Sequence, residues 1–340
     1  MTRVGIPHGL FYYYYYPWWK TFFNYLGAEV VCSNPTTRLT VDQGIGAAVD
    51  EICFPLKVYF GHVLELKRYE LDWIFIPRMV SVEHRSYICP KFMGLPDMIR
   101  ASIPDLPPII DITVDVSQSN RILKRDLLQL GKLFTSRESR IREAIKRARE
   151  EQNFCDTLAS QGYTREEAIQ LWEGKATHSF QAPILNLGVL GHGYSLYDAV
   201  INMNLINHLR NMGCRLWFPE SLDADDVETS AATIPKRVFW TLGRKMVGSA
   251  IHLSQQPEID GIIYLACFGC GPDSLIGEII ERQINDKPYM LLTVDEHSGE
   301  TGMITRLEAF CDMLLRRKNT GNEDNISAHG QYAYCRQSTI

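Results

Sequence analysis

Runs of apolar residues alternate with amphipathic, helix-like segments in both halves of the chain. In the first half, the apolar run RVGIPHG is followed by an aromatic helix-like segment and then by a second apolar run, AEVVCS. The second half repeats this order, with LNLGVLGHG first and CRLWFPE second. Alternation of helices with nearly continuous apolar strands predicts parallel sheets that helices cover on both faces.

The two halves also correspond at single positions. His8 and His192 follow the first apolar run of each half, and the acidic residues Asp72 and Asp260 each precede a third apolar run. This correspondence indicates a duplicated strand–helix plan. We therefore predict an α/β fold with two Rossmann- or flavodoxin-like lobes, each built around a parallel sheet, and a site in the cleft between them.

The segment between the halves has a different composition. It is charged and helical, and Thr164 with Glu167 has the spacing of a capping box at a helix start. A helical connector is the structure that this pattern favours. We predict four parts in chain order: an N-terminal α/β lobe at residues 1–117, a helical connector at 118–180, a C-terminal α/β lobe at 181–318, and a polar, flexible tail at 319–340.

Bulk composition removes several functional classes. The chain has 340 residues, of which 45% are hydrophobic, and this is enough for two cores of ordinary domain size. The net charge of −5 leaves no basic excess, so nucleic acid is not an expected partner. The N-terminal segment lacks the apolar core of a signal peptide, and no apolar run has the length of a membrane span. We therefore expect a cytoplasmic protein.

Nine cysteines are many for a chain in a reducing compartment, where disulfides are disfavoured. Spare thiols there are either buried apolar residues or ligands. Packing or incidental roles are predicted for five of them: Cys32, Cys155, Cys214, Cys311 and, in the polar tail, Cys335. Four remain as candidates for chemistry: Cys53, Cys89, Cys267 and Cys270.

The pair Cys267 and Cys270 follows a predicted strand, at the edge of the sheet where parallel α/β folds bind ligands. Its spacing suits a redox disulfide, half of a zinc site, a catalytic thiol or part of an iron–sulfur site. A redox pair is disfavoured because the motif lies late in the chain. Tetrahedral zinc is disfavoured because Cys53 and Cys89 are single cysteines in different segments. No histidine stands at a spacing that supports a catalytic thiol.

An iron–sulfur site needs three or four thiolates and tolerates ligands from distant loops. Proline or glycine accompanies three of the candidates, in CFP at Cys53, CPKF at Cys89 and CGPDS at Cys270. Nearby cations that can offset the negative charge of a cluster are Lys57, Arg78 and Lys91. The residues favour an iron–sulfur site, and unrelated buried thiols are the main alternative.

Several long motifs resemble the acyl-CoA dehydratase activase-related proteins. That family is similar to the catalytic subunits of 2-hydroxyacyl-CoA dehydratases and benzoyl-CoA reductases and to the double-cubane cluster proteins. The resemblance covers residues from about 3 to 117 and from about 184 to 316. It is carried by GIPHGLFYYYYYPWWKTFFNYLGAEVV, VDEICFPLKVYFGHV, IFIPRMVSVEHRSYICPKFMGLPDMIRASIP, FGCGPDSLIGEIIER and LLTVDEHSGETGMITRLEAF.

The resemblance implies anaerobic iron–sulfur chemistry. It assigns Cys53, Cys89 and Cys270 to a [4Fe–4S] cluster and leaves Cys267 as either a fourth ligand or a buried neighbour, of which we predict the second. A double-cubane [8Fe–9S] cluster is the alternative, and would need a second subunit. The implied partners are an ATP-hydrolysing iron–sulfur activase of the actin/Hsp70-like class and a second copy or a related subunit. No ATP site is expected in this chain.

The segment TVDEHSGETG follows the last predicted strand and supplies Glu296, His297 and Glu300. They are the candidate catalytic residues, because they could line the cleft and transfer protons. An equally supported alternative is that they cap a helix and carry surface charge. The aromatic stretch at residues 11–19 is predicted to pack between helix and sheet.

The sequence thus predicts an iron–sulfur oxidoreductase that resembles reductases and dehydratases. It accepts low-potential electrons from the activase and reduces an unknown substrate or acceptor. A non-enzymatic iron–sulfur scaffold and a zinc-stabilised binding module are the alternatives, and a CoA thioester substrate rests on the resemblance alone.

Overall fold

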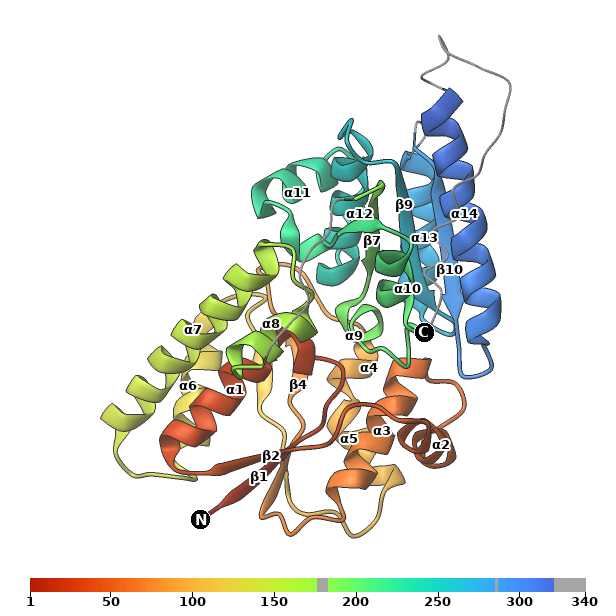
Figure 1. The fold of residues 1–340 in the computed structure, drawn as a ribbon. Coiled ribbons are helices and arrows are strands. Elements are labelled where there is room, and N and C mark those ends of the chain that lie inside the picture. The colour runs from red at the N-terminus through yellow and green to blue at the C-terminus, as the bar shows by residue number, and fades with distance from the viewer. Residues whose placement is uncertain (176–182, 285–286, 321–340) are drawn as a thin grey trace.

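The structure is a computed structural model that describes residues 1–175, 183–284 and 287–320, so most of the predicted tail, with Cys335, lies outside the described residues. It contains two four-stranded parallel sheets, one in each half of the chain (Figure 1). The N-terminal sheet is formed by β1 (Arg3–Ile6), β2 (Glu29–Cys32), β3 (Trp73–Phe75) and β5 (Ile109–Ile110). The C-terminal sheet is formed by β7 (Leu185–Gly191), β8 (Cys214–Trp217), β9 (Gly261–Cys267) and β10 (Tyr289–Val294).

Both sheets have the same topology. The strand order is β2-β1-β3-β5 in the first and β8-β7-β9-β10 in the second, so the first strand of each half lies between the second and the third. Every strand pair within these sheets is parallel. The predicted α/β class with two flavodoxin-like parallel sheets is therefore confirmed.

The acidic residue before the third strand has the same structural role in both lobes. The carboxylate of Asp72 accepts the backbone N–H of Arg3 at 2.7 Å, and the carboxylate of Asp260 accepts that of Asn186 at 2.8 Å. Each acid also donates its own N–H to the carbonyl of the same partner. The repeated acid thus satisfies a backbone donor at the start of the central strand, where the sheet ladder has not yet begun.

One predicted strand is broken. The apolar run from Asp72 forms β3 and then, after Pro77, a separate strand β4 (Arg78–Ser81) that pairs with β6 (Thr113–Asp115) in a small two-stranded sheet. Proline has no backbone N–H and cannot donate to a ladder. The run therefore leaves the main sheet at this residue and carries the chain toward the second lobe.

Five helices belong to the N-terminal lobe: α1 (Tyr12–Leu26), α2 (Arg38–Ala47), α3 (Phe54–Leu66), α4 (Pro90–Met93) and α5 (Leu95–Ser102). Residues 12–19 of the aromatic stretch form the N-terminal half of α1, and most of their side chains are buried. The ring of Trp19 lies 4.3 Å from that of Phe75 in β3, and the ring of Phe11 lies 5.0 Å from that of Phe92 in α4. The stretch therefore packs against the sheet and neighbouring helices, as predicted.

The connector is helical and consists of α6 (Asn120–Gly131), α7 (Glu138–Ser160) and α8 (Arg165–Trp172). The predicted capping box is confirmed, because Thr164 Oγ1 accepts the N–H of Glu167 and the Glu167 carboxylate accepts the N–H of Thr164. Gln152 of α7 donates to the carbonyl of Tyr14, which fastens the connector to α1 (Figure 1). No helix in the three described stretches has both the length and the apolarity to cross a membrane.

Helices cover both faces of the C-terminal sheet. They are α9 (Gly193–Leu196), α10 (Leu205–Asn211), α11 (Ala224–Ala231), α12 (Thr241–Ser254), α13 (Gly271–Gln283) and α14 (Glu300–Thr320), with a 3₁₀ turn, η1 (Pro219–Ser221). All seven residues of β9 are buried. Ile262 and Tyr264 face the core with α12 and α13, whereas Ile263 and Leu265 face the core with α10 and α14.

A buried chain of hydrogen bonds connects the two lobes. Ser33 Oγ lies 3.1 Å from Nδ1 of His62, and Thr36 Oγ1 lies 3.0 Å from its Nε2. The same threonine donates to the carboxylate of Asp198 in the other lobe. Burial, together with the charge of His8, lowers the pKa of His62 to about 3, so this imidazole is neutral in the folded protein.

We predict that the neutral state of His62 makes the fold acid-sensitive. Between its folded pKa of about 3 and the ordinary value of about 6.5, the unfolded chain binds more protons, so stability falls as the pH falls. From about pH 7.5 to about pH 5, this loss is on the order of 2 kcal/mol. Denaturant unfolding at both pH values should show a smaller pH dependence for His62→Gln, whereas His252→Gln should retain that of the wild type.

Helices α2 and α3 cross with their backbones in contact. A Cβ atom on Gly61 would lie 1.9 Å from the carbonyl oxygen of Thr40, and one on Gly44 would lie 2.0 Å from that of Lys57. Only residues without a side chain fit at this crossing, which fixes the position of α3 and so of the residue at its start.

We predict that Gly61→Ala lowers the free energy of unfolding by about 3 kcal/mol or more, because the methyl group forces the two helices apart. Gly46, also in α2, has no atom within 4 Å of a Cβ position. Gly46→Ala should therefore leave stability unchanged or raise it by up to about 1 kcal/mol. Equal losses in urea unfolding of the two variants would contradict the backbone contact.

Candidate metal site at the lobe interface

Three of the four candidate cysteines occupy the same local position, directly before the first turn of a helix. Cys53 precedes α3, Cys89 precedes α4 and Cys270 precedes α13, with a proline at the first or second helical position each time. Proline suits a helix start because its fixed φ is helical and its missing N–H would have had no partner in the helix. The N–H groups left free in these turns favour negative charge at the preceding residue.

The fold brings these three thiols together from both lobes. A hydrogen bond from the Cys270 thiol lowers the pKa of Cys53, assisted by the charge of Lys91, although burial acts in the other direction. The same hydrogen bond and burial raise the pKa of Cys270. Burial also raises the pKa of Cys89, and the charge of Cys53 adds to the rise. Cys53 therefore lies within electrostatic reach of both Cys270 and Cys89 at the interface.

Two further polar side chains join the cysteines. Nδ1 of His192, the residue that follows β7, lies 2.7 Å from Oδ1 of Asp273 in the first turn of α13. His192, Asp273 and Cys270 offer ligand atoms that all lie within 4.8 Å of one another, and all three side chains are buried. This His/Cys/Asp group can bind a metal ion.

Asp273 is held firmly in place. Its Oδ1 accepts the hydroxyl of Tyr264 at 2.7 Å, and its Oδ2 accepts the backbone N–H of Cys267 at 3.1 Å. Burial alone would raise the pKa of Asp273, but the charge of His192 and these hydrogen bonds outweigh it and lower the pKa. Burial would lower the pKa of His192, and Asp273 reverses this effect and raises it. The two side chains therefore form a buried pair in which each shifts the pKa of the other.

Cys267 has a different environment from Cys270. It is the last residue of β9, and its thiol donates to Ser195 Oγ in α9 at 3.2 Å. Burial raises the pKa of Cys267 well above the ordinary value. Gly269, with φ of +75°, turns the chain between the two cysteines, a conformation that favours glycine. Cys270 therefore faces Cys53, while Cys267 faces Ser195 of α9.

The segment that carries Cys89 is attached to the second lobe. The N–H of Tyr87 donates to the carbonyl of Phe239 at 2.9 Å, and the carbonyl of Tyr87 accepts the N–H of Thr241 at 3.0 Å. Next to Cys89, the ring of Phe92 lies 5.5 Å from that of Tyr194 in α9. These contacts hold Cys89 across the lobe boundary, next to the residues that follow β7.

The three nearby cations have different partners. Lys91 donates to the carbonyl of Glu51 and is the one whose charge acts on Cys53. Lys57, which is buried, forms an ion pair with Glu296 at 2.5 Å. Arg78 is paired with acidic residues of its own lobe, Asp97 at 2.7 Å among them. Of these side chains, Lys91 is therefore positioned to balance thiolate charge.

The three candidate catalytic residues are not brought together. Glu296 contacts Lys57 in the first turns of α3, whereas Glu300 lies at the surface, 2.9 Å from Nε2 of His208. The backbone N–H of His297 donates to the carboxylate of Asp295. Of this segment, Glu296 is the residue that reaches the helix started by Cys53.

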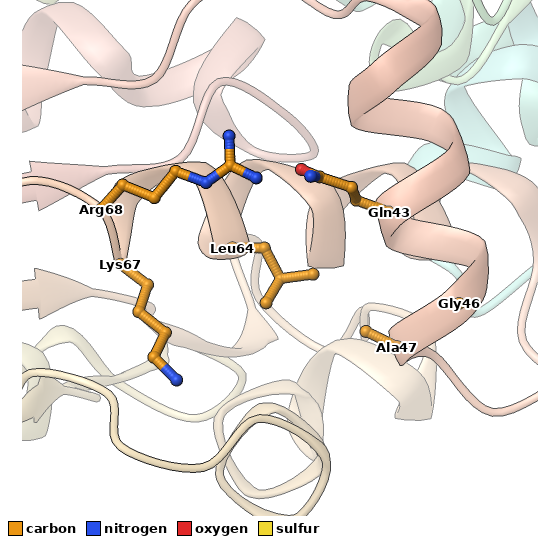
Figure 2. Close-up of a pocket in the computed structure, with 6 residues that line it drawn as sticks. All are labelled: Gln43, Gly46, Ala47, Leu64, Lys67 and Arg68. Carbon is orange, nitrogen blue, oxygen red and sulfur yellow. The ribbon is translucent and has the colours of Figure 1, made fainter.

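Two other features lie away from the cysteines. His8, the counterpart of His192, is buried 3.5 Å from the Glu166 carboxylate of α8. A surface hollow of about 490 Å³ lies between α2 and the C-terminal end of α3, about 16 Å along the helix from Cys53. In Figure 2, Arg68 extends across this hollow toward Gln43. It is lined by Gln43, Gly46, Ala47, Leu64, Lys67 and Arg68.

Sequence reasoning did not assign His192 and Asp273 to one group. It noted His192 only as the residue after the first apolar run of its half, and it gave Asp273 no role. The sequence did show that each residue follows a predicted strand. Neighbouring parallel strands end at the same edge of a sheet, so residues that follow them lie close together. The sequence did not show that β7 pairs with β9, and this pairing is what places His192 beside Asp273.

We predict that Asp273→Ala lowers the free energy of unfolding by about 3 kcal/mol or more, because it leaves three buried groups without their partner: the ring of His192, the hydroxyl of Tyr264 and the N–H of Cys267. On the same helix, Glu278 forms an exposed pair with Arg282. Glu278→Ala should therefore change stability by less than about 0.5 kcal/mol. Both values come from denaturant unfolding of chelator-treated protein, and a small loss for Asp273→Ala would mean that the buried pair is not formed.

A comparison with protein families agrees with the resemblance found in the sequence. The family model described as CoA enzyme activase uncharacterised domain (DUF2229) matches residues 3–222, which is more than half of the chain. The matched segment holds Cys53, Cys89 and His192, and it ends before β9. Among curated proteins, no sequence matches this chain. The chain belongs to the family of CoA enzyme activase uncharacterised domains.

Proposed function

We propose that this chain is an iron–sulfur redox protein. It holds a [4Fe–4S]-type cluster at the lobe interface, accepts low-potential electrons from a separate ATP-hydrolysing activase, and reduces a small substrate or acceptor. The observation that carries the proposal is the convergence of Cys53, Cys89 and Cys270 from three helix starts in two lobes. Packing alone does not require such a meeting of thiols, whereas an iron–sulfur cluster does.

The residues present fit this group by their chemistry. Three thiols lie beside backbone N–H groups, and one cation acts on them, Lys91. The buried side chains of His192 and Asp273 lie in one group with Cys270, and their ligand atoms lie within 4.8 Å of one another. Thiol, imidazole and carboxylate groups gathered in this way are typical metal ligands. When bound, the cluster supplies one-electron transfer and, at an iron without a thiolate, a Lewis-acid contact.

The chain's own residues provide the enclosure. Cys53 and Cys270 are each 7% exposed, and the rings of Phe92 and Tyr194 lie beside the helix starts that carry the cysteines. Exclusion of water strengthens the electrostatic effect of the nearby N–H groups and of Lys91. Glu296, held by Lys57, is the candidate for moving protons from the surface toward this enclosure.

The proposed partner follows from the family and from the resemblance. The family description refers to CoA enzyme activases, which supports electron delivery by an activase of the actin/Hsp70-like class. We further propose a cytoplasmic, dimeric protein in an anaerobic setting. A double-cubane [8Fe–9S] cluster would need thiolates from a second subunit beyond the three that converge here.

A zinc-stabilised binding module is the second candidate function. Three thiols and one imidazole are also a common tetrahedral set for structural zinc, and His192 lies within the group that contains Cys270. Zinc has no redox chemistry, so metal analysis and spectroscopy separate the two functions directly.

We predict that anoxically reconstituted protein binds about three to four irons with matching sulfide and gives a cluster EPR signal after reduction. Cys53→Ser, Cys89→Ser and Cys270→Ser should each lose more than about half of the iron, because each removes one thiolate ligand. Cys267→Ser should keep its iron because that thiol donates to Ser195. Cys155→Ser, in the connector, is the matched control.

Contrary outcomes are specific. A colourless protein with less than about one iron per chain after reconstitution rejects the redox proposal. About one zinc per chain, lost in the same three variants, establishes the second candidate instead. Loss of iron from Cys267→Ser alone makes that residue a ligand.

A further inference from the structure

We propose that His192 is the fourth protein ligand of the metal centre and that Asp273 holds its imidazole in the binding position. This inference rests on the proposed function, since it names a ligand of the same site. It concerns a residue that the thiol pattern does not include, and it changes the site from three thiolates with one open position to a set of three thiolates and one imidazole.

The first step is position. His192 follows β7 directly, and β7 pairs with β9 in parallel register from Leu187↔Gly261 to Gly191↔Leu265. His192 therefore emerges beside the end of β9, where the loop to Cys270 begins. The helices after these two strands leave on opposite faces of the sheet, and the crevice between such strands is where parallel α/β folds bind ligands.

The second step is orientation. The ring of His192 stacks on that of Tyr194, with centroids 5.1 Å apart and planes 9° from parallel. Its Nδ1 lies 2.7 Å from Asp273, which is itself held by Tyr264 and the backbone of Cys267. A carboxylate beside the ring is the usual companion of a metal-bound histidine, because it orients the ring and raises the basicity of the binding nitrogen.

The position of α9 depends on the other lobe. The hydroxyl of Tyr14, from α1, accepts the backbone N–H of Gly193 at 2.7 Å. A Cβ atom on Gly193 would lie 2.7 Å from that oxygen, so glycine permits this close approach. The imidazole before Gly193 is thus placed by residues of both lobes, as are the thiols of Cys53 and Cys270.

A structural histidine in the same chain shows the contrast. Both ring nitrogens of His62 have hydroxyl partners, Ser33 at 3.1 Å and Thr36 at 3.0 Å. In His192, Asp273 engages Nδ1 at 2.7 Å, no hydrogen bond to Nε2 is found among the described residues, and the side chain lies in a group with Cys270. Both ring nitrogens of His62 have partners, whereas Asp273 engages Nδ1 of His192 and leaves its Nε2 as the candidate ligand atom.

The chemistry allows this ligand set. In iron–sulfur proteins, imidazole replaces thiolate at some irons and raises the reduction potential, because a neutral ligand donates less charge than a thiolate. A fourth protein ligand at this position also restricts access of a substrate oxygen to iron. The inference therefore favours an electron-transfer centre over a Lewis-acid centre at this site.

The test is pulsed EPR on the reduced, anoxically reconstituted full chain. A strong ¹⁴N coupling is expected, which converts to a ¹⁵N coupling when the protein is grown with ¹⁵N-histidine. His192→Gln should lose this coupling while it retains a cluster signal, and His62→Gln should keep it. His192→Cys should restore a fully ligated cluster with a lower reduction potential. The isotope comparison uses wild-type protein, so it stands even where a variant fails to fold.

The outcomes separate this inference from the proposed function. A cluster signal without nitrogen coupling overturns the His192 ligand and leaves the redox function in place. A chain without iron overturns the redox function. In that case, cobalt(II) is bound to the protein and its absorption spectrum tests whether His192 is a ligand. Ligand-field bands that shift in His192→Gln but not in His62→Gln support it, and unshifted bands overturn it. A chain that binds neither metal overturns both.

Discussion

The parallel pairing of β7 with β9 is the constraint on which the site depends. Neighbouring parallel strands end at one edge of the sheet, so His192 and the segment from Cys267 to Asp273 emerge side by side. The helices that follow, α9 and α13, then leave on opposite faces of the sheet. The N-terminal lobe has the same strand order, and its loops supply Cys53 and Cys89 to this edge.

A buried carboxylate connects the parts of this edge. Asp273 accepts hydrogen bonds from the hydroxyl of Tyr264 in the middle of β9 and from the backbone of Cys267 at its end, and it pairs with His192 after β7. A charge of this kind is stable in the interior only when its partners hold it completely. The strand end, the helix start and the imidazole are therefore positioned together, before any metal is considered.

Features set by neighbouring residues were predicted correctly from the sequence. The capping box at Thr164 and the burial of the aromatic stretch depend on nearby residues and on periodicity, and the duplicated strand–helix plan follows from repeated apolar runs. The interruption at Pro77 shows the limit of this reasoning, because the run was expected to form one strand. An apolar pattern indicates extended structure, whereas the missing N–H of proline decides where the ladder stops.

The sequence by itself determined the two parallel α/β lobes and the helix start at Thr164, since periodicity and capping residues are local properties. The tertiary structure alone decided which thiols meet. Cys267 and Cys270 differ by three positions, yet the strand geometry directs one to Ser195 and the turn at Gly269 directs the other to Cys53. Strand register and the packing of two lobes set such directions, and both depend on residues far apart in the chain.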